Sequence, residues 1–329
     1  MVQEAPAGWE WVACPLCGAT ESELVFETRN LLFGADVRAS LRRCRCGLGM
    51  TNPQPVGEEL GKYYQAQEYY THDGGRSLKA RARAVAQRWQ LRGPAARARL
   101  HLERATDLRR FTSRFVPDDF GLEKGLRLLD YGCGSGDVGE LCKGLGLEVI
   151  GVEPDPKARA AAEARGIRVV GSLGELGALA QSFDRIVLRH VLEHVRDPIG
   201  TLRDLGSRLS STGRILVAVP NVDAHQAKVF GDGWIGYDMP RHLWHFSAAT
   251  LGAAAAGAGL RVVRMSSVEL SGFAAASLAN VEPQRRGELS AQHWSARAVE
   301  ASGGGAELVA VLGAGDGHAT TPIVAGGGS

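Results

Sequence analysis

The sequence feature that most constrains this fold is the stretch Leu126–Gly136, which reads LRLLDYGCGSG. A short apolar run with an acid, Asp130, at its end is typical of a buried parallel strand. Gly132, Gly134 and Gly136 follow at every second position, and they allow a tight turn and a close approach of the backbone to a ligand. A helix after such a turn offers free N–H groups to a polar or anionic group. We therefore expect a cofactor site here.

Short apolar runs and helical patterns alternate from this stretch onward. The expected strands are 126–129, 148–153, 167–170, 183–188, 215–219, 260–268 and 308–312, and the expected helices are 138–145, 156–165, 199–209 and 248–256. This alternation predicts an α/β fold with a doubly wound, mostly parallel, seven-stranded Rossmann-like sheet. Such a sheet binds its ligand at the carboxyl ends of its strands. Glu153 ends the second strand and is placed to bind a ribose.

Two classes of cofactor use this arrangement. A dinucleotide is compatible with residues 134–139, which fit the G-x-G-x-x-G pattern. Asp130 favours the other class, because an acid at the end of the first strand suits a cofactor that carries an ammonium group. The same acid would repel the pyrophosphate of a dinucleotide.

Over about residues 122–312 the chain resembles class I S-adenosylmethionine (SAM)-dependent methyltransferases. The resemblance rests on Leu129–Gly136, on Val152-Glu153-Pro154, and on Phe183-Asp184 together with Val191–Pro198. It implies that the glycine turn contacts the methionine part of SAM and that Glu153 binds both ribose hydroxyls. Ser172 lies where such enzymes hold the adenine, although the common acid is missing there, and His190 is expected to face the cofactor. The cofactor-binding residues expected are Asp130, Gly132, Gly134, Gly136, Glu153, Ser172, His190 and Tyr69.

Four cysteines near the N-terminus form two closely spaced pairs. They are Cys14, Cys17, Cys44 and Cys46. Each pair lies on a turn that ends in glycine, and two such turns can hold one zinc ion tetrahedrally. Residues 1–58 are therefore expected to form a small ribbon with a structural zinc, since four thiolates leave no open position for substrate. The alternative is unrelated buried thiols. Cys133 and Cys142 are interpreted as packing residues.

Residues 59–120 are expected to form a helical connector and a lid. Tyrosine pairs at 63–64 and 69–70 could fold over the cofactor, which is why Tyr69 is a candidate, or could only pack the connector onto the core. Residues 76–114 are rich in Ala and Arg. They form either a solvated helix face or a contact with a phosphate-bearing substrate or an acidic carrier protein. The Gly/Ala/Thr-rich tail, 315–329, is expected to be disordered.

The loop at 221–247, in the core region 121–314, carries the second informative stretch. It contains two tryptophans, a tyrosine and a phenylalanine that are expected to line a substrate pocket. His242 is the candidate general base, with His245 in support, and the alternative is that both histidines are structural. The loop is similar to that of zinc-containing sugar C-methyltransferases, which carry a Tyr-His-Glu-His run. Met239 and Arg241 replace the Tyr and Glu here, and this departure favours O-methylation.

These features predict a SAM-dependent methyltransferase with a small-molecule acceptor from sugar or secondary metabolism, free, nucleotide-linked or carrier-bound. O-methylation is slightly favoured over C-methylation. The alternative is a zinc-ribbon RNA methyltransferase. It is disfavoured because the loop after the fourth strand lacks an Asn/Asp-Pro-Pro-aromatic run. The net charge of +2 excludes a strongly basic nucleic-acid binder as an interpretation of the whole chain, though not a local basic patch. No signal sequence or membrane span is indicated, so a cytoplasmic protein is expected. The oligomeric state is not indicated.

Overall fold

The computed structural model describes residues 4–29, 38–64, 117, 120–180, 182–281, 283–290 and 296–315. The candidate lid residue Tyr69, the Arg-rich connector and residues 316–329 of the tail lie outside the described residues, and the expectations for them stay predictions.

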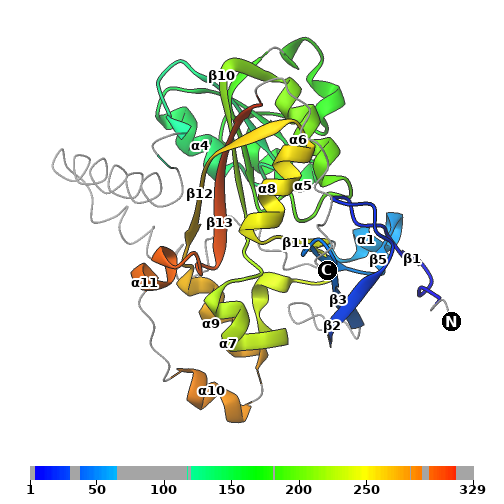
Figure 1. The fold of residues 1–329 in the computed structure, drawn as a ribbon. Coiled ribbons are helices and arrows are strands. Elements are labelled where there is room, and N and C mark those ends of the chain that lie inside the picture. Colours follow the sequence, from blue (N-terminus) through cyan, green and yellow to red (C-terminus); the bar gives the residue numbers. More distant parts are fainter. Residues whose placement is uncertain are drawn as a thin grey trace, which may run out of the picture.

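The centre of the molecule is a seven-stranded sheet in the order β12-β13-β10-β9-β6-β7-β8 (Figure 1). The strands are β6 (Arg127–Tyr131), β7 (Glu148–Val152), β8 (Arg168–Val170), β9 (Phe183–Arg189), β10 (Leu209–Pro220), β12 (Leu260–Val268) and β13 (Glu307–Ala314). Strands β8, β7, β6, β9 and β10 are parallel, and only β13 runs antiparallel to its two neighbours. The sequence-based α/β fold with a mostly parallel seven-stranded sheet is therefore confirmed.

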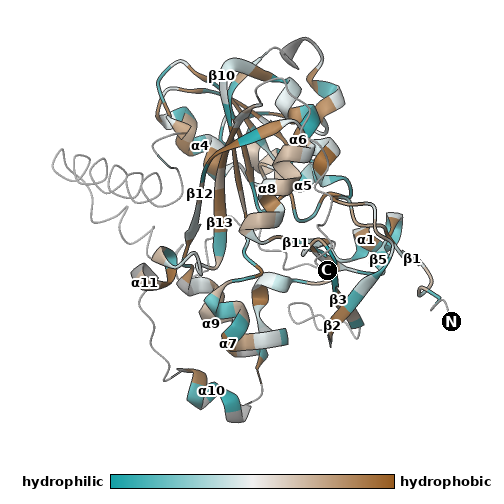
Figure 2. Ribbon diagram, viewed as in Figure 1, coloured by the Kyte–Doolittle hydropathy of each residue, from teal (hydrophilic) through white to brown (hydrophobic). Residues whose placement is uncertain are grey.

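Helices cover both faces of this sheet. They are α4 (Asp137–Gly144), α5 (Pro156–Glu163), α6 (Pro198–Ser207) and α8 (Ala248–Gly257). Neighbouring residues of β6 point to opposite faces, so Leu128 packs in the cluster that contains Cys142 of α4, whereas Leu129 packs in the cluster that contains α6 and α8. Figure 2 shows the strands in the middle of the sheet in brown, as expected for strands buried on both faces.

Side-chain caps begin three of these helices. Asp155 accepts a hydrogen bond from the backbone of Ala158 at α5, and Asp197 accepts one from Gly200 at α6. Ser247 begins α8 with a reciprocal capping box to Thr250. Helix α6 ends at Ser207, two residues before the expected end, because β10 already begins at Leu209.

The expected loop at 221–247 contains regular structure, and three helices follow β12. These elements are α7 (His225–Phe230), single turns at 231–233 and 235–237, β11 (Trp244–His245), α9 (Ser271–Asn280), α10 (Pro283–Ser290) and α11 (Ala296–Ala301). The sequence analysis did not predict them. They are short, and α9 is built largely from small residues that give a weak helical period.

The N-terminal residues form two small antiparallel sheets and one helix. The elements are β1 (Trp9–Glu10), β2 (Ser22–Arg29), β3 (Arg38–Cys44), β4 (Gly49–Thr51), β5 (Gln54–Pro55) and α1 (Gly57–Lys62). Strand β1 pairs with β5. The larger sheet has the order β11-β4-β3-β2, and its edge strand β11 comes from the loop at 221–247 (Figure 1). The two regions are thereby joined by backbone hydrogen bonds.

The two regions also share hydrophobic packing. Leu48 and Met50 belong to the same buried cluster as Ile186 and Val217 of the central sheet. Leu41 of β3 packs in a second cluster with Trp234, Tyr237 and Met239. Among the described residues, no helix has both the length and the apolar character needed to cross a membrane.

Candidate functional site

The glycine turn after β6 has the backbone shape that the sequence predicted. Gly132, Gly134 and Gly136 have φ angles of +75°, +52° and +83°, a region that other residues rarely adopt. A Cβ atom on Gly132 would lie 2.4 Å from Cγ2 of Val191, and one on Gly136 would lie 2.6 Å from Cδ1 of Ile167. Glycine is therefore required at Gly132 and Gly136 both by the backbone conformation of the turn and by its close packing against Val191 and Ile167.

Asp130 lies on β6, directly before this turn, and its side chain is buried. Its Oδ2 atom has no hydrogen-bond partner within the part of the chain that the structure describes. Burial raises the pKa of Asp130 to about 7, although a backbone hydrogen bond from Gly139 opposes the shift. A buried carboxyl with one unpaired oxygen fits a ligand that brings its own positive charge, such as the ammonium group of SAM.

Glu153 follows β7, the neighbour of β6 in the sheet. Its two carboxylate oxygens accept hydrogen bonds of 2.9 Å from the backbone N–H groups of Gly134 and Asp155. The acid is thus held against the glycine turn, at the carboxyl end of the second strand. This position and its acceptor oxygens fit the two hydroxyls of a ribose.

Ser172 lies just beyond the end of β8, and its hydroxyl donates to Oε1 of Glu175. Oε2 of Glu175 accepts a hydrogen bond from the backbone of Gly171. Sequence reasoning found no acid after this strand because it considered only the residues that follow the strand directly. The structure brings Glu175 back to this position through a short turn, and Glu175 is therefore the acid nearest to Ser172 among the described residues.

His190 follows β9 and joins two buried carboxylates. Its Nε2 atom lies 2.8 Å from Oε1 of Glu307, and its Nδ1 atom lies 3.3 Å from Oε1 of Glu193. Burial alone would lower its pKa, but the two acids outweigh burial and raise the pKa of His190 to about 9. The imidazole is therefore charged at neutral pH, and its φ of +54° is the strained geometry often found at functional sites. The sequence predicted neither acid as a partner of His190.

His242 is buried in the loop and lies beside Glu193 and Asp238. Its Nδ1 atom is 2.9 Å from the carbonyl oxygen of Gly236, which can only accept, so Nδ1 carries the proton. Nε2 therefore has a lone pair, and it lies 3.9 Å from Oε1 of Glu193 and 3.8 Å from Oδ2 of Asp238. Burial, with the neighbouring His194 and His245, lowers the pKa of His242 well below its usual range. His242 is neutral at neutral pH and can accept a proton at Nε2.

The acids beside His242 are themselves buried. Glu193 is 1% exposed, and among the described residues its Oε2 atom has no hydrogen-bond partner. Asp238 forms a buried ion pair with Arg241. Burial raises the pKa of Asp238 to about 6, although Arg241 opposes the shift. The carboxylates of Glu193 and Asp238 therefore lie close enough to stabilise a positive charge on His242.

His245 differs from His242 in its contacts. Its Nε2 atom lies 3.0 Å from Oγ1 of Thr51, and burial lowers its pKa to about 3. The four aromatic residues of the loop pack in two hydrophobic clusters, and the substrate pocket expected around them stays a prediction. Trp244 and Phe246 pack in the central hydrophobic cluster, whereas Trp234 and Tyr237 pack in the cluster on the other side of the loop.

One segment connects the cofactor turn to this loop. It is the segment 190–194, which follows β9. Val191 packs against Gly132 of the turn, and the carbonyl oxygen of Glu193 accepts hydrogen bonds of 2.8 and 3.3 Å from the backbones of Leu243 and Trp244. The candidate cofactor site and the candidate base are therefore neighbours across a single short segment.

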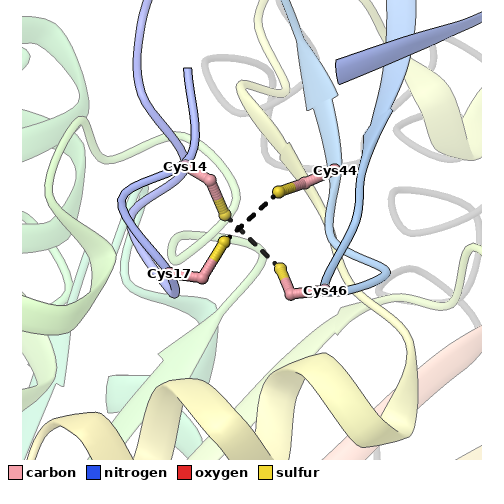
Figure 3. Close-up of side chains that lie close together, drawn as sticks. All are labelled: Cys14, Cys17, Cys44 and Cys46. Carbon is pink, nitrogen blue, oxygen red and sulfur yellow. Dashed lines mark hydrogen bonds between the residues drawn. The ribbon is translucent and has the colours of Figure 1, made fainter. Parts of the chain in front are cut away.

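The four N-terminal cysteines meet at one point (Figure 3). The sulfur atoms of Cys14 and Cys46 lie 3.5 Å apart, those of Cys17 and Cys44 lie 3.4 Å apart, and all four lie within 4.8 Å of one another. Four thiolates about 2.3 Å from one zinc ion would be separated by similar distances. The sulfurs thus fit the tetrahedral site that the sequence predicted. Zinc itself stays a prediction.

The other two cysteines are buried packing residues, as predicted. Cys142 lies in the cluster of β6 and β10, and Cys133 packs with Ile167. A second set of possible metal ligands occurs in the loop region, where Glu193, His194 and His242 each offer an atom within 4.8 Å of the others. His194 Nδ1 already lies 2.9 Å from the hydroxyl of Tyr64 and 3.1 Å from the carbonyl oxygen of Arg241.

Comparisons with known proteins agree with this geometry. A family model described as a methyltransferase domain matches residues 100–265. The chain is 33% identical over 132 residues to a ubiquinone biosynthesis O-methyltransferase of Azorhizobium caulinodans, covering 37% of this chain and 52% of that protein. It is 30% identical over 210 residues to the enzyme of the same name from Parvibaculum lavamentivorans, covering 57% and 82%. The chain spans about half the length of the first of these relatives.

Solved structures resemble the chain more distantly. A SAM-dependent methyltransferase from Archaeoglobus fulgidus is 21% identical, with a TM-score of 0.43, and the match covers 64% of this chain and 93% of that one. One from Mesorhizobium loti is 17% identical, with a TM-score of 0.40, and covers 59% and 94%. The family model covers half of the chain, and the strand order and glycine turn fit the same family. The chain therefore belongs to the methyltransferase-domain family of class I, SAM-dependent methyltransferases.

Proposed function

We propose that this protein transfers a methyl group from SAM to a hydroxyl oxygen of a small-molecule acceptor, with His242 as the proton acceptor. The observation that carries the proposal is the state of His242. Its Nδ1–H donates a hydrogen bond to the carbonyl oxygen of Gly236, so Nε2 carries a lone pair. The imidazole is neutral at neutral pH. A neutral imidazole can take the proton that a hydroxyl loses as it is methylated.

SAM supplies an already activated methyl group, so the protein has to position two groups and move one proton. Asp130 and the glycine turn would hold the methionine part, and Glu153 would hold the ribose. His242 Nε2 then accepts the proton of the acceptor hydroxyl. The resulting positive charge lies about 4 Å from the buried carboxylates of Glu193 and Asp238, which stabilise it.

Two arguments support oxygen as the methylated atom. The relatives at 30–34% identity are named O-methyltransferases. The loop also places Met239 and Arg241 where C-methyltransferases of sugars carry Tyr and Glu, and Arg241 is used here in an ion pair with Asp238. We therefore propose a hydroxylated acceptor and leave the sugar pathway of the sequence analysis aside.

A panel assay identifies the acceptor. The purified protein is incubated with SAM labelled in the methyl group and with catechols, other phenols, deoxysugar nucleotides and bulk tRNA. We expect label in a phenolic or alcoholic acceptor, and NMR of the product should show a new O–CH₃ group. Label only in RNA, or a new C–CH₃ group, would contradict the proposal.

A further inference from the structure

The N-terminal ribbon reaches the candidate base through strand pairing. Strand β4 pairs with β11, so that Met50 faces Trp244 and Gly49 faces His245. The backbone N–H of Thr51 donates a hydrogen bond of 3.0 Å to the carbonyl oxygen of Leu243. The residue directly after His242 is thus fixed by the end of β4.

The contact between these strands is close. A Cβ atom on Gly49 would lie 2.9 Å from Cβ of His245 and 3.1 Å from its carbonyl oxygen, so no larger residue fits without a shift. Leu48, Met50 and Trp244 pack in the same buried cluster as Cys14 and Cys44. Strand β4 therefore packs near the cysteine site and also pairs with the loop that carries His242 and His245.

Thr51 makes the most specific contact. It is fully buried, and its hydroxyl oxygen lies 2.6 Å from the carbonyl oxygen of His242 and 3.0 Å from Nε2 of His245. A hydroxyl has one proton, and a carbonyl oxygen can only accept, so Thr51 donates to His242. The oxygen of Thr51 then accepts from Nε2–H of His245. One hydroxyl thereby fixes the backbone of His242 and the tautomer of His245.

We propose that Thr51 is a positioning residue for His242, so that the N-terminal ribbon is part of the active site. The inference rests on the proposed function of His242. Thr51 holds the backbone of His242, the proposed base, in position. His245 donates a buried hydrogen bond that holds the Thr51 hydroxyl in place. The ribbon is therefore required for proton transfer, in addition to any role in folding.

Two substitutions separate this role from a structural one. Thr51→Val keeps the shape and removes the hydroxyl, whereas Thr51→Ser keeps the hydroxyl. With the best acceptor of the panel, we expect Thr51→Val to lower kcat on the order of ten- to a hundredfold, because a small displacement of a catalytic group is costly. S-adenosylhomocysteine (SAH) affinity should be unchanged, and Thr51→Ser should restore most of kcat.

A second readout needs no acceptor. Proton NMR should show a slowly exchanging ring N–H of His245, assigned by its loss in His245→Gln. It should persist in Thr51→Ser and shift upfield or exchange with water in Thr51→Val. The inference is overturned if folded Thr51→Val keeps wild-type kcat, if the two Thr51 variants lose it equally, or if the ring N–H is unchanged. Wild-type turnover by His242→Gln would instead overturn the proposed function, and with it the reason for positioning.

Discussion

Oε2 of Glu153 accepts a hydrogen bond of 2.9 Å from the backbone N–H of Gly134. The acid at the end of β7 is therefore held against the turn at the end of β6. These are the two positions that we propose bind the ribose and the methionine part of SAM. Because Glu153 would accept hydrogen bonds from ribose hydroxyls, its loss should weaken cofactor binding.

Glu153→Ala is expected to weaken SAH binding on the order of a hundredfold or more, because it removes two hydrogen bonds to a charged acceptor, each contributing about 1.5–3 kcal/mol. Calorimetry measures the effect. Glu148→Ala, at the other end of the same strand, is the matched control and should bind SAH as the wild type does. Equal weakening in both variants would show that Glu153 does not contact the cofactor.

Asp130 predicts a pH dependence of binding. Its pKa is raised to about 7, and an ammonium group binds its carboxylate form, so SAH affinity should increase as pH rises through about 7. Binding below this pH should release a proton, which calorimetry in buffers of different ionisation enthalpy detects. A flat affinity between about pH 6 and pH 8, without proton release, would contradict the assignment.

The same group predicts the sign of a stability change. Because the folded-state pKa of Asp130 lies above its unfolded value, the folded state binds more protons between about pH 4 and pH 7, and this group's contribution to stability falls as pH rises through that window. Asp130→Asn removes the buried charge. We expect it to raise the melting temperature at about pH 8 and to abolish SAH binding. A lower melting temperature would contradict this account.

Gly132→Ala tests the shape of the glycine turn. The new Cβ would lie 2.4 Å from Val191 in a backbone conformation with φ of +75°. We expect a loss of about 2 kcal/mol or more in the free energy of unfolding, measured with denaturant, together with weaker SAH binding. Gly144→Ala, in α4, is the control, because among the described residues nothing beyond its own helix lies within 4 Å of the new Cβ; it should be neutral or slightly stabilising. A neutral Gly132→Ala would refute the crowding argument.

Metal analysis tests the cysteine site. We expect one zinc per chain in protein purified under reducing conditions, and loss of that zinc in Cys14→Ser. Cys142→Ser changes a buried packing residue and should keep the metal. Protein without zinc would contradict the four-thiolate site. A second metal ion bound at Glu193, His194 and His242 would remove the lone pair that His242 needs as a base.

The central sheet could be predicted from the sequence because each strand is recognisable from the pattern of a few neighbouring residues. All seven expected strands occur, because most of them contain a short apolar run bounded by a turn. The glycine turn is recognisable from its residue types and their spacing. The cysteine cluster could also be predicted from the sequence, because closely spaced cysteine pairs on glycine-ended turns form a local pattern typical of zinc sites.

The surroundings of His242 and His190 depend on contacts between distant parts of the chain. Glu307 reaches His190 because β13 inserts beside β10, and Thr51 reaches His242 across 191 positions. Strand β11 has only two residues, which is too short for an alternation of apolar and polar residues to predict its pairing with β4. The position of Glu193 between His190 and His242 likewise follows from the fold.

The most direct test of the account is the turnover of His242→Gln with the identified acceptor at saturating SAM, beside its SAH affinity. His225→Gln, on α7, is the control. The account predicts that His242→Gln lowers kcat by about 10²–10⁴-fold, the usual contribution of a general base, while SAH affinity and the melting temperature stay near wild type. Wild-type kcat in folded His242→Gln would contradict it.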